Sequence, residues 1–170
     1  MKKKFTFIDA GYPGSAHDIR VFKNTELYNR LTNDPDSVLK SNNNHLIGDS
    51  GFQLAPYMLV PYKDYGNLNR IQRKYNRKLS QTRYVIENTF CLLKQRFRRL
   101  KCLDVKVKRM PDIIIACCVV HNITMQFAEE EAALLAEGLE IPRTVHDPLL
   151  PNLPAVLGGD YKRDYIAAIM

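Results

Sequence analysis

The feature that most constrains the fold of this chain is an unbroken apolar run over residues 113–120. Pro111 stands just before the run, and proline suits the first turn of a helix. A helix that is apolar on all sides has no face for solvent, so we expect other elements to bury it all round. The run is shorter than the roughly 18 residues that a membrane-spanning helix needs. The sequence therefore predicts a buried core helix and no membrane span.

A second helical pattern covers residues 80–100. At about 100° per residue, six apolar side chains fall on one stripe that we expect to face the core: Leu79, Ile86, Phe90, Leu93, Phe97 and Leu100. Five charged side chains fall in a narrow arc at the edge of this stripe: Arg83, Glu87, Lys94, Arg98 and Lys101. Glu87 is then the one acidic residue on a basic strip.

The rest of the chain alternates short elements with turns, which indicates a mixed α/β fold. The expected strands are 5–8, 45–49 and 105–108. Further helices are expected at 18–31, at 129–140 and in the last ten residues, and loops at 33–44, 53–78 and 142–159. A length of 170 residues fits one domain of ordinary size, or most of one.

Charge is concentrated in the middle of the chain. Residues 61–110 hold 15 Lys and Arg, eight of them Arg, against three acidic residues, whereas residues 129–170 hold three basic and eight acidic residues. Such a block is typical of proteins that bind a polyanion, because each cation near a phosphate releases counterions. A solvated face crowded with cations is the alternative.

Composition excludes several classes. A hydrophobic fraction of 45% argues against disorder over the whole length. The four cysteines include the adjacent pair Cys117–Cys118 and no CxxC spacing, which argues against a disulfide scaffold or a zinc knuckle. No apolar stretch follows the basic first residues, so we expect no signal peptide and an intracellular protein.

Two carboxylates could carry chemistry. Asp49 ends a predicted strand just before Ser50-Gly51, and Glu87 lies at a helix edge. Metal nucleases hold Mg²⁺ or Mn²⁺ between carboxylates on rigid elements, and the ions activate water and stabilise the leaving oxygen. Arg83 and its basic neighbours would then face the phosphate backbone. Two structural readings stay open: Asp49 as a turn former, and Arg83–Glu87 as an ordinary i,i+4 helix pair.

Other polar and aromatic residues have both functional and structural interpretations. His121-Asn122 could supply a general base, but a histidine satisfied by hydrogen bonds is the favoured interpretation. Four tyrosines near basic residues could stack on bases or could pack within loops: Tyr57, Tyr62, Tyr65 and Tyr75.

Five motifs occur in order along the chain: GYPGSAHD (11–18), LIGDSGF (46–52), YNRKLSQTRYVIENTF (75–90), LKQRF (93–97) and IIACCVVHNI (114–123). Together they resemble the PIF/Harbinger family of DDE transposases and the Harbinger transposase-derived nucleases of animals, over roughly residues 5–127. The resemblance implies an RNase H-like α/β fold and divalent-metal chemistry on DNA phosphodiesters. It also implies a nuclear site of action, with the cytoplasm as an alternative, and a Myb-like partner protein for target binding.

By the same resemblance, Asp49 matches the second acid of the catalytic triad and Glu87 the third. Arg83 matches the arginine that precedes this glutamate. His17 and Asp18 match a motif to which we assign no catalytic role. The metal ligands implied are Asp49 and Glu87.

The chain departs from the family pattern at its beginning. The first catalytic aspartate of the family lies upstream of the GYPGS motif, and this chain starts at what resembles the third strand. We therefore expect an RNase H-like fold that lacks its first two strands, with a partial endonuclease domain at 1–127 and an acidic helix, proline-rich loop and tail at 128–170. Asp9 could replace the missing acid only in a rearranged fold.

With two acids of three, we expect weak or absent activity. The alternative is a domesticated, non-catalytic module that binds DNA or protein.

Overall fold

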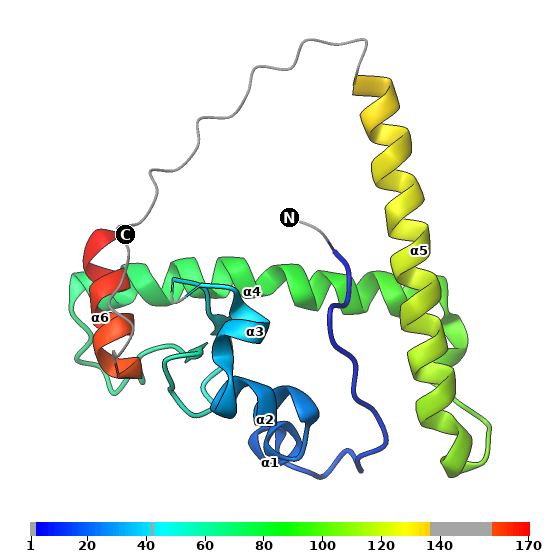
Figure 1. Ribbon diagram of the computed structural model, residues 1–170, viewed down its shortest axis with the longest axis horizontal. Helices are drawn as coiled ribbons and strands as arrows, with labels where there is room; N and C mark the ends of the chain where they lie inside the picture. Colours follow the sequence, from blue (N-terminus) through cyan, green and yellow to red (C-terminus); the bar gives the residue numbers. More distant parts are fainter. Residues whose placement is uncertain (1–2, 42, 137–157) are drawn as a thin grey trace. The chain divides into compact units, whose positions relative to one another are not determined.

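The computed structural model describes residues 3–41, 43–136 and 158–170 (Figure 1). The chain divides into two compact units. The first, called the α5 unit, comprises Met1–Gly11 and Val85–Leu149 and contains the whole of α5 (Met110–Ala136). The second, called the sheet unit, comprises Tyr12–Tyr84 and Leu150–Met170. The long helix α4 (Arg70–Arg96) contributes to both units.

The sheet unit is built on two very short parallel strands, β1 (Leu46–Ile47) and β2 (Met58–Leu59). Leu46 lies opposite Met58, and Ile47 lies opposite Leu59. The C-terminal helix α6 (Gly159–Ile169) and the first part of α4 pack on β2. Their buried side chains form the core of this unit: Leu59, Tyr75, Leu79, Ile166 and Ala167. The strand predicted at 45–49 is confirmed in part by β1.

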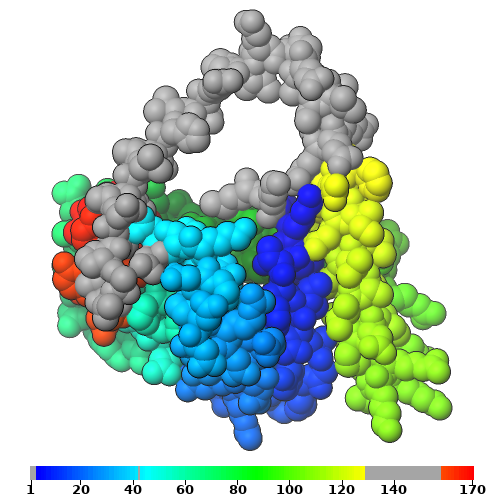
Figure 2. All heavy atoms as spheres, viewed as in Figure 1, coloured from blue at the N-terminus to red at the C-terminus, as the bar shows by residue number. Residues whose placement is uncertain are grey.

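Three short helices precede the sheet: α1 (Asp18–Lys23), α2 (Glu26–Asn33) and α3 (Pro35–Leu39). Their atoms form one continuous surface, blue to light blue in Figure 2. The single helix predicted at 18–31 is wrong, because Thr25 starts a second helix by accepting a hydrogen bond from the Tyr28 N–H at 3.1 Å. The loop predicted at 33–44 is also wrong in part, since Asp34 caps α3 and Pro35 occupies its first turn.

The α5 unit contains an extended N-terminal segment, residues 3–11, rather than the strand predicted at 5–8. Figure 2 shows this segment (dark blue) against α5 (green to yellow). Side chains of α5 take the place of a neighbouring strand: Asn122 accepts from the Phe5 N–H at 2.8 Å and donates to the Phe5 carbonyl at 2.7 Å. Because no strand pairs with the segment among the described residues, no ladder forms.

The prediction that α5 is buried all round is wrong. Cys118 and His121 are buried, but Ile115, Val119 and Ile123 are 38%, 47% and 50% exposed. The apolar stripe predicted on α4 is likewise only partly buried, since Leu79 and Leu93 are covered while Ile86 and Phe90 are 40% and 47% exposed. The physical reason is that only one side of each helix meets a packing partner in the described part of the chain.

The segment Val107–Ala128 is long and apolar enough, by length and composition alone, to cross a membrane. This is weak support for a membrane span, because the core helix of a soluble protein passes the same test. Within the segment, His121 and Asn122 make hydrogen bonds to the N-terminal segment of the chain. These contacts fit a packed protein helix.

The remaining differences concern element boundaries. α4 begins at Arg70, within the loop predicted at 53–78, and ends at Arg96. The 3₁₀ helix η1 (Arg98–Lys101) follows it, because the Phe97 backbone leaves the helical region. The strand predicted at 105–108 is wrong, since Val107–Arg109 forms the 3₁₀ helix η2.

The C-terminal predictions are tested only where the structure describes the chain. α5 runs through residue 127, the predicted domain boundary, and on to residue 136, which confirms the first part of the predicted 129–140 helix. Residues 137–157, with most of the predicted loop, lie outside the described residues. The terminal helix is confirmed as α6. The mixed α/β class is confirmed, and the RNase H-like topology without its first two strands stays a prediction.

Candidate functional site

Asp49 directly follows β1 and closes a tight turn. Its Oδ1 accepts a hydrogen bond from the Gly51 N–H at 2.8 Å, and its carbonyl accepts one from the Phe52 N–H at 3.2 Å. Gly48 is tightly enclosed, since a Cβ would lie 3.0 Å from the Met58 sulfur and from the Phe52 side chain, which would have to shift. The turn-forming role of Asp49 is therefore confirmed, and the turn fixes the position of the carboxylate.

The structure brings Arg83 of α4 to Asp49 in the sheet unit. The Arg83 Nη2 lies 3.8 Å from the Asp49 Oδ2, and the two side chains are 27% and 38% exposed. At this distance and exposure the ion pair contributes little to stability. The Asp49 Oδ2 is thus near a cation, on a side chain that is still partly exposed to solvent.

Glu87 lies four residues after Arg83 in α4, on the adjacent turn of the same helix, and is exposed. Asp9 in the N-terminal segment is also exposed. Within residues 3–41, 43–136 and 158–170, no three His, Cys, Asp or Glu residues gather as a metal-binding group. The described chain therefore contains the two predicted carboxylates without a completed triad.

The predicted phosphate-binding cations are spread over two kinds of element. Lys94 lies near the end of α4, whereas Arg98 and Lys101 lie on η1. All three are exposed, and Arg83 is half-buried. The prediction of one helical arc is wrong for Arg98 and Lys101, because α4 ends at Arg96.

His17 and Asp18 start α1. His17 is the N-cap residue without a side-chain capping bond, Asp18 is the first helical residue, and both are exposed. A carboxylate at this end of a helix interacts favourably with the helix dipole. The structure gives these two residues no further contact that indicates chemistry.

His121 is fully buried within α5, and both ring nitrogens have partners. Arg96 Nη1 donates to Nδ1 at 2.9 Å, and Nε2 lies 2.9 Å from the Lys3 carbonyl. Since arginine only donates, Nδ1 must accept, and Nε2 then carries the hydrogen. The interpretation of His121 as a satisfied structural histidine is confirmed.

Two basic residues of the sheet unit, the buried Lys162 and the half-buried His45, gave no signal in the sequence. The Lys162 Nζ donates to the carbonyls of Asn44 and Pro56 at 2.8 and 3.0 Å, joining α6 to the loops around the sheet. Burial lowers the pKa of Lys162. Burial and the nearby Lys162 lower the pKa of His45. A lone lysine in an amphipathic C-terminal helix looks like any solvated residue, so sequence patterns could not find this contact.

The four tyrosines have different environments. Tyr75 is in the core, and the Tyr62 hydroxyl donates to Asp164 Oδ1 at 2.5 Å while Arg163 lies 4.0 Å from its ring centroid. Ordinary packing explains these two. Tyr65 is 80% exposed, and Tyr57 is half-buried beside a small cavity.

Comparison with known proteins gives the family. Residues 1–122 match the model described as DDE superfamily endonuclease. The chain belongs to this family. It is 30% identical over 138 residues to the protein named "Protein ALP1-like" from Arabidopsis thaliana, covering 75% of this chain and 34% of the relative.

Two further relatives carry the name "Putative nuclease HARBI1". The human protein is 30% identical and the rat protein 32% identical over 123 residues, each covering 70% of this chain and 33% of the relative. The chain thus spans about a third of the length of the curated relatives that it matches. No solved structure matches this chain significantly. The predicted resemblance to DDE endonucleases is confirmed, and a nuclease-derived function is supported.

Proposed function

We propose that this chain is a metal-dependent, DNA-directed endonuclease domain that acts on phosphodiester bonds, with Asp49 and Glu87 as ligands to Mg²⁺ or Mn²⁺. One observation carries the proposal: the turn after β1 fixes Asp49 beside Arg83, on the helix that carries Glu87. Membership of a DDE endonuclease family supports it. The catalytic roles proposed for Asp49 and Glu87 come from the family resemblance of the motifs that contain them.

The side chains fit a hard divalent cation. Carboxylate oxygens are the ligands that such ions prefer, and protein-bound Mg²⁺ commonly takes one or two carboxylates while water and substrate phosphate fill the other positions. When bound, the ion supplies Lewis acidity and lowers the pKa of a water nucleophile. Asp49 would offer Oδ2 to the ion, and Arg83 would then be released toward a phosphate of the DNA backbone.

The exposed cations supply the other part of the proposed site. Lys94, Arg98 and Lys101 would bind the DNA backbone together with Arg83, because each can neutralise a phosphate charge. A slow reaction is expected from two carboxylates, since a two-ion site depends on more ligands to position both ions. A nuclear site of action and a Myb-like partner remain predictions from the family resemblance.

The experiment is nicking of supercoiled plasmid by the full chain with Mg²⁺ or Mn²⁺. We expect slow, metal-dependent nicking that falls by at least about 100-fold in Asp49→Asn and in Glu87→Gln, since even residues that only support metal ligands contribute 10- to 100-fold. Asp104→Asn is the matched control, because Asp104 is an exposed acid in the same basic segment. It should nick at the wild-type rate.

The nicking experiment can also favour the alternative function, a non-catalytic module that binds DNA. If the chain binds DNA but never nicks it, and Asp49→Asn leaves DNA affinity unchanged or slightly higher, a non-catalytic DNA-binding module replaces the enzyme. The specific observation behind this alternative is the absence of a three-carboxylate group among the described residues.

A further inference from the structure

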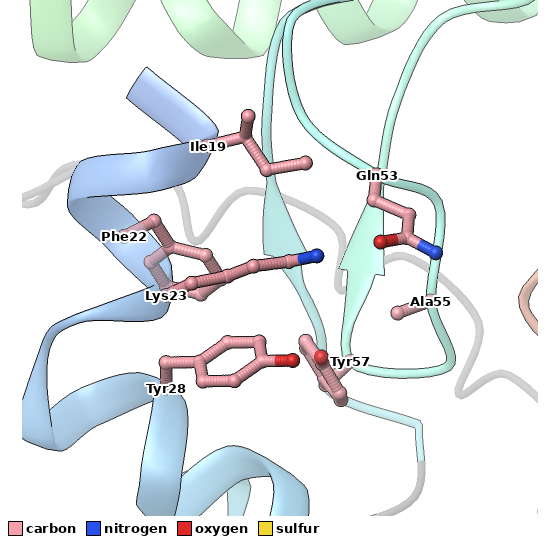
Figure 3. A pocket seen from close by; sticks show the side chains of 7 residues that line it. All are labelled: Ile19, Phe22, Lys23, Tyr28, Gln53, Ala55 and Tyr57. Atoms are coloured by element: carbon pink, nitrogen blue, oxygen red, sulfur yellow. The ribbon is translucent and has the colours of Figure 1, made fainter. Parts of the chain in front are cut away.

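A small cavity lies in the sheet unit between the first helices and the loop that follows β1 (Figure 3). Its volume is about 110 Å³. It is lined by seven residues, three of them aromatic: Ile19, Phe22, Lys23, Tyr28, Gln53, Ala55 and Tyr57. Pockets for drug-sized ligands are several times larger, so this one suits a fragment of about one ring system.

The cavity is joined to the Asp49 turn by a chain of ring contacts. Phe52, whose N–H bonds to the Asp49 carbonyl, packs edge-on against Phe22 with ring centroids 5.7 Å apart. Phe22 in turn packs edge-on against Tyr28 at 5.4 Å. Gln53 follows Phe52 directly in the chain and lines the cavity. The cavity wall, formed by α1, α2 and the loop after β1, is therefore connected through packed rings to the turn that holds Asp49.

The polar groups at the cavity suit the edge of a heterocyclic ring. Figure 3 shows the Tyr28 hydroxyl pointing toward Tyr57, and the Lys23 side chain running beside Phe22. Lys23 and Gln53 are exposed, so their side chains can form hydrogen bonds with a ligand without disrupting the packed core of the sheet unit. The Tyr57 hydroxyl can donate and accept hydrogen bonds at neutral pH, as any tyrosine hydroxyl can, and burial together with the neighbouring Tyr28 raises its pKa further.

We propose that this cavity binds one unpaired nucleobase of the DNA substrate, next to the phosphate that Asp49 and its metal ion would engage. The inference rests on the proposed DNA-directed function. An aromatic wall offers stacking to any base, the Gln53 amide can donate and accept at a base edge, and Lys23 can pair with the adjoining phosphate. Binding one base outside the duplex would fix the register of the strand at the site.

The test compares two short single strands that share one backbone: a fluorescein-labelled 12-nucleotide oligothymidylate and the same strand with abasic sites throughout. Anisotropy titrations of the full chain in EDTA avoid cleavage. We expect the oligothymidylate to bind about tenfold more tightly than the abasic strand, since stacking on an aromatic side chain contributes about that factor or more per base. Tyr57→Ala should remove most of this difference and leave abasic binding unchanged.

Matched variants keep the test decisive if Tyr57→Ala fails to fold. Tyr57→Phe retains the ring and should keep most of the difference. Gln53→Ala changes an exposed side chain and should reduce the difference about threefold or more. Tyr65→Ala, an exposed tyrosine outside the cavity, should change nothing.

Equal binding of both strands by the wild type would overturn the base-binding role while leaving a DNA-binding function intact. So would a difference that persists in both Tyr57→Ala and Gln53→Ala. Absence of binding to either strand would instead overturn the proposed DNA-directed function on which the inference rests.

Discussion

The Asp49 carboxylate has two partners, one that holds its Oδ1 in place and one that lies near its Oδ2. The Gly51 N–H fixes Oδ1 at 2.8 Å, so the side chain cannot rotate freely. The Arg83 guanidinium lies 3.8 Å from Oδ2, near enough for attraction and too far for a strong hydrogen bond. At the proposed site, a divalent ion would therefore meet a preformed carboxylate whose second oxygen makes only a weak contact with Arg83.

His45 makes the stability of the sheet unit sensitive to pH. Its folded-state pKa lies below 6.5 because of burial and the charge on Lys162. Well above pH 6.5 the ring is neutral in both the folded and the unfolded state. As the pH falls below 6.5, the unfolded chain gains a proton before the folded chain does, so the free energy of unfolding decreases until the folded-state pKa is reached.

We expect urea unfolding followed between pH 7 and 5 to show this loss, and His45→Gln to flatten it. His17→Gln is the control, because His17 is exposed at the start of α1 and should leave the slope as in the wild type. An unchanged slope in His45→Gln would show that another group causes the pH dependence.

At the level of elements, α6 depends on a glycine at its first residue. A Cβ on Gly159 would lie 2.7 Å from the backbone carbon of Ala55, and backbone cannot move aside as a flexible side chain can. We expect Gly159→Ala to displace α6 from the sheet unit and to lower the free energy of unfolding by about 1–3 kcal/mol. Thermal or urea denaturation measures this loss.

Gly14→Ala is the matched control for that substitution. A Cβ on Gly14 would have no atom within 4 Å, so its effect should stay within about 1 kcal/mol. Equal effects of the two substitutions would mean that the close approach of α6 to Ala55 does not limit stability.

The sequence predicts some elements well and others poorly. Elements that depend on interactions between residues close in the sequence are predicted well, and those that depend on contacts between distant residues are not. Periodicity and Pro111 are local signals, and they locate α4 and α5 within a few turns. The boundary between α1 and α2 depends on the Thr25 hydroxyl, which caps α2. A threonine can also occur inside a helix, so its presence in the sequence does not predict a boundary. The extended segment at Phe5 depends on a hydrogen bond to the side-chain amide of Asn122, 117 residues away. A local sequence pattern cannot predict such a contact.

The same limit applies to the candidate site. The motifs identify Asp49 and Glu87, and the turn after β1 follows from Ser50-Gly51. The contact between Arg83 and Asp49 could not be predicted. A helical pattern gives the spacing between Arg83 and Glu87 within one helix, but it does not show which other element that helix packs against. The sequence predicts too much burial for α5, because an apolar run shows that a helix favours apolar neighbours but does not show that such neighbours cover every side of it.

At the scale of the whole molecule, we expect the concentration of basic residues over 61–110 to set how strongly the proposed DNA binding depends on salt. If four cations bind phosphates (Arg83, Lys94, Arg98 and Lys101), the logarithm of the DNA association constant should fall with the logarithm of salt concentration with a slope of about −3.6. Affinity would then decrease by about 100-fold between 50 and 200 mM salt. Anisotropy titrations over this range measure the slope.

Replacement of one proposed contact gives the control. Lys94→Gln should reduce the magnitude of the slope by about 0.9, whereas Lys40→Gln, outside the basic segment, should leave it unchanged. A slope near zero in the wild type would mean that the basic segment is a solvated surface rather than a phosphate-binding one.

The most direct test of the proposed metal site is titration of the ¹⁵N-labelled chain with Mn²⁺, followed by paramagnetic broadening of backbone amide signals. We expect the amides of Ser50 and Gly51 and those flanking Glu87 to broaden first, and Asp49→Asn to abolish this selectivity. Broadening centred elsewhere in the chain, or an unchanged pattern in Asp49→Asn, would show that Asp49 and Glu87 do not hold the ion.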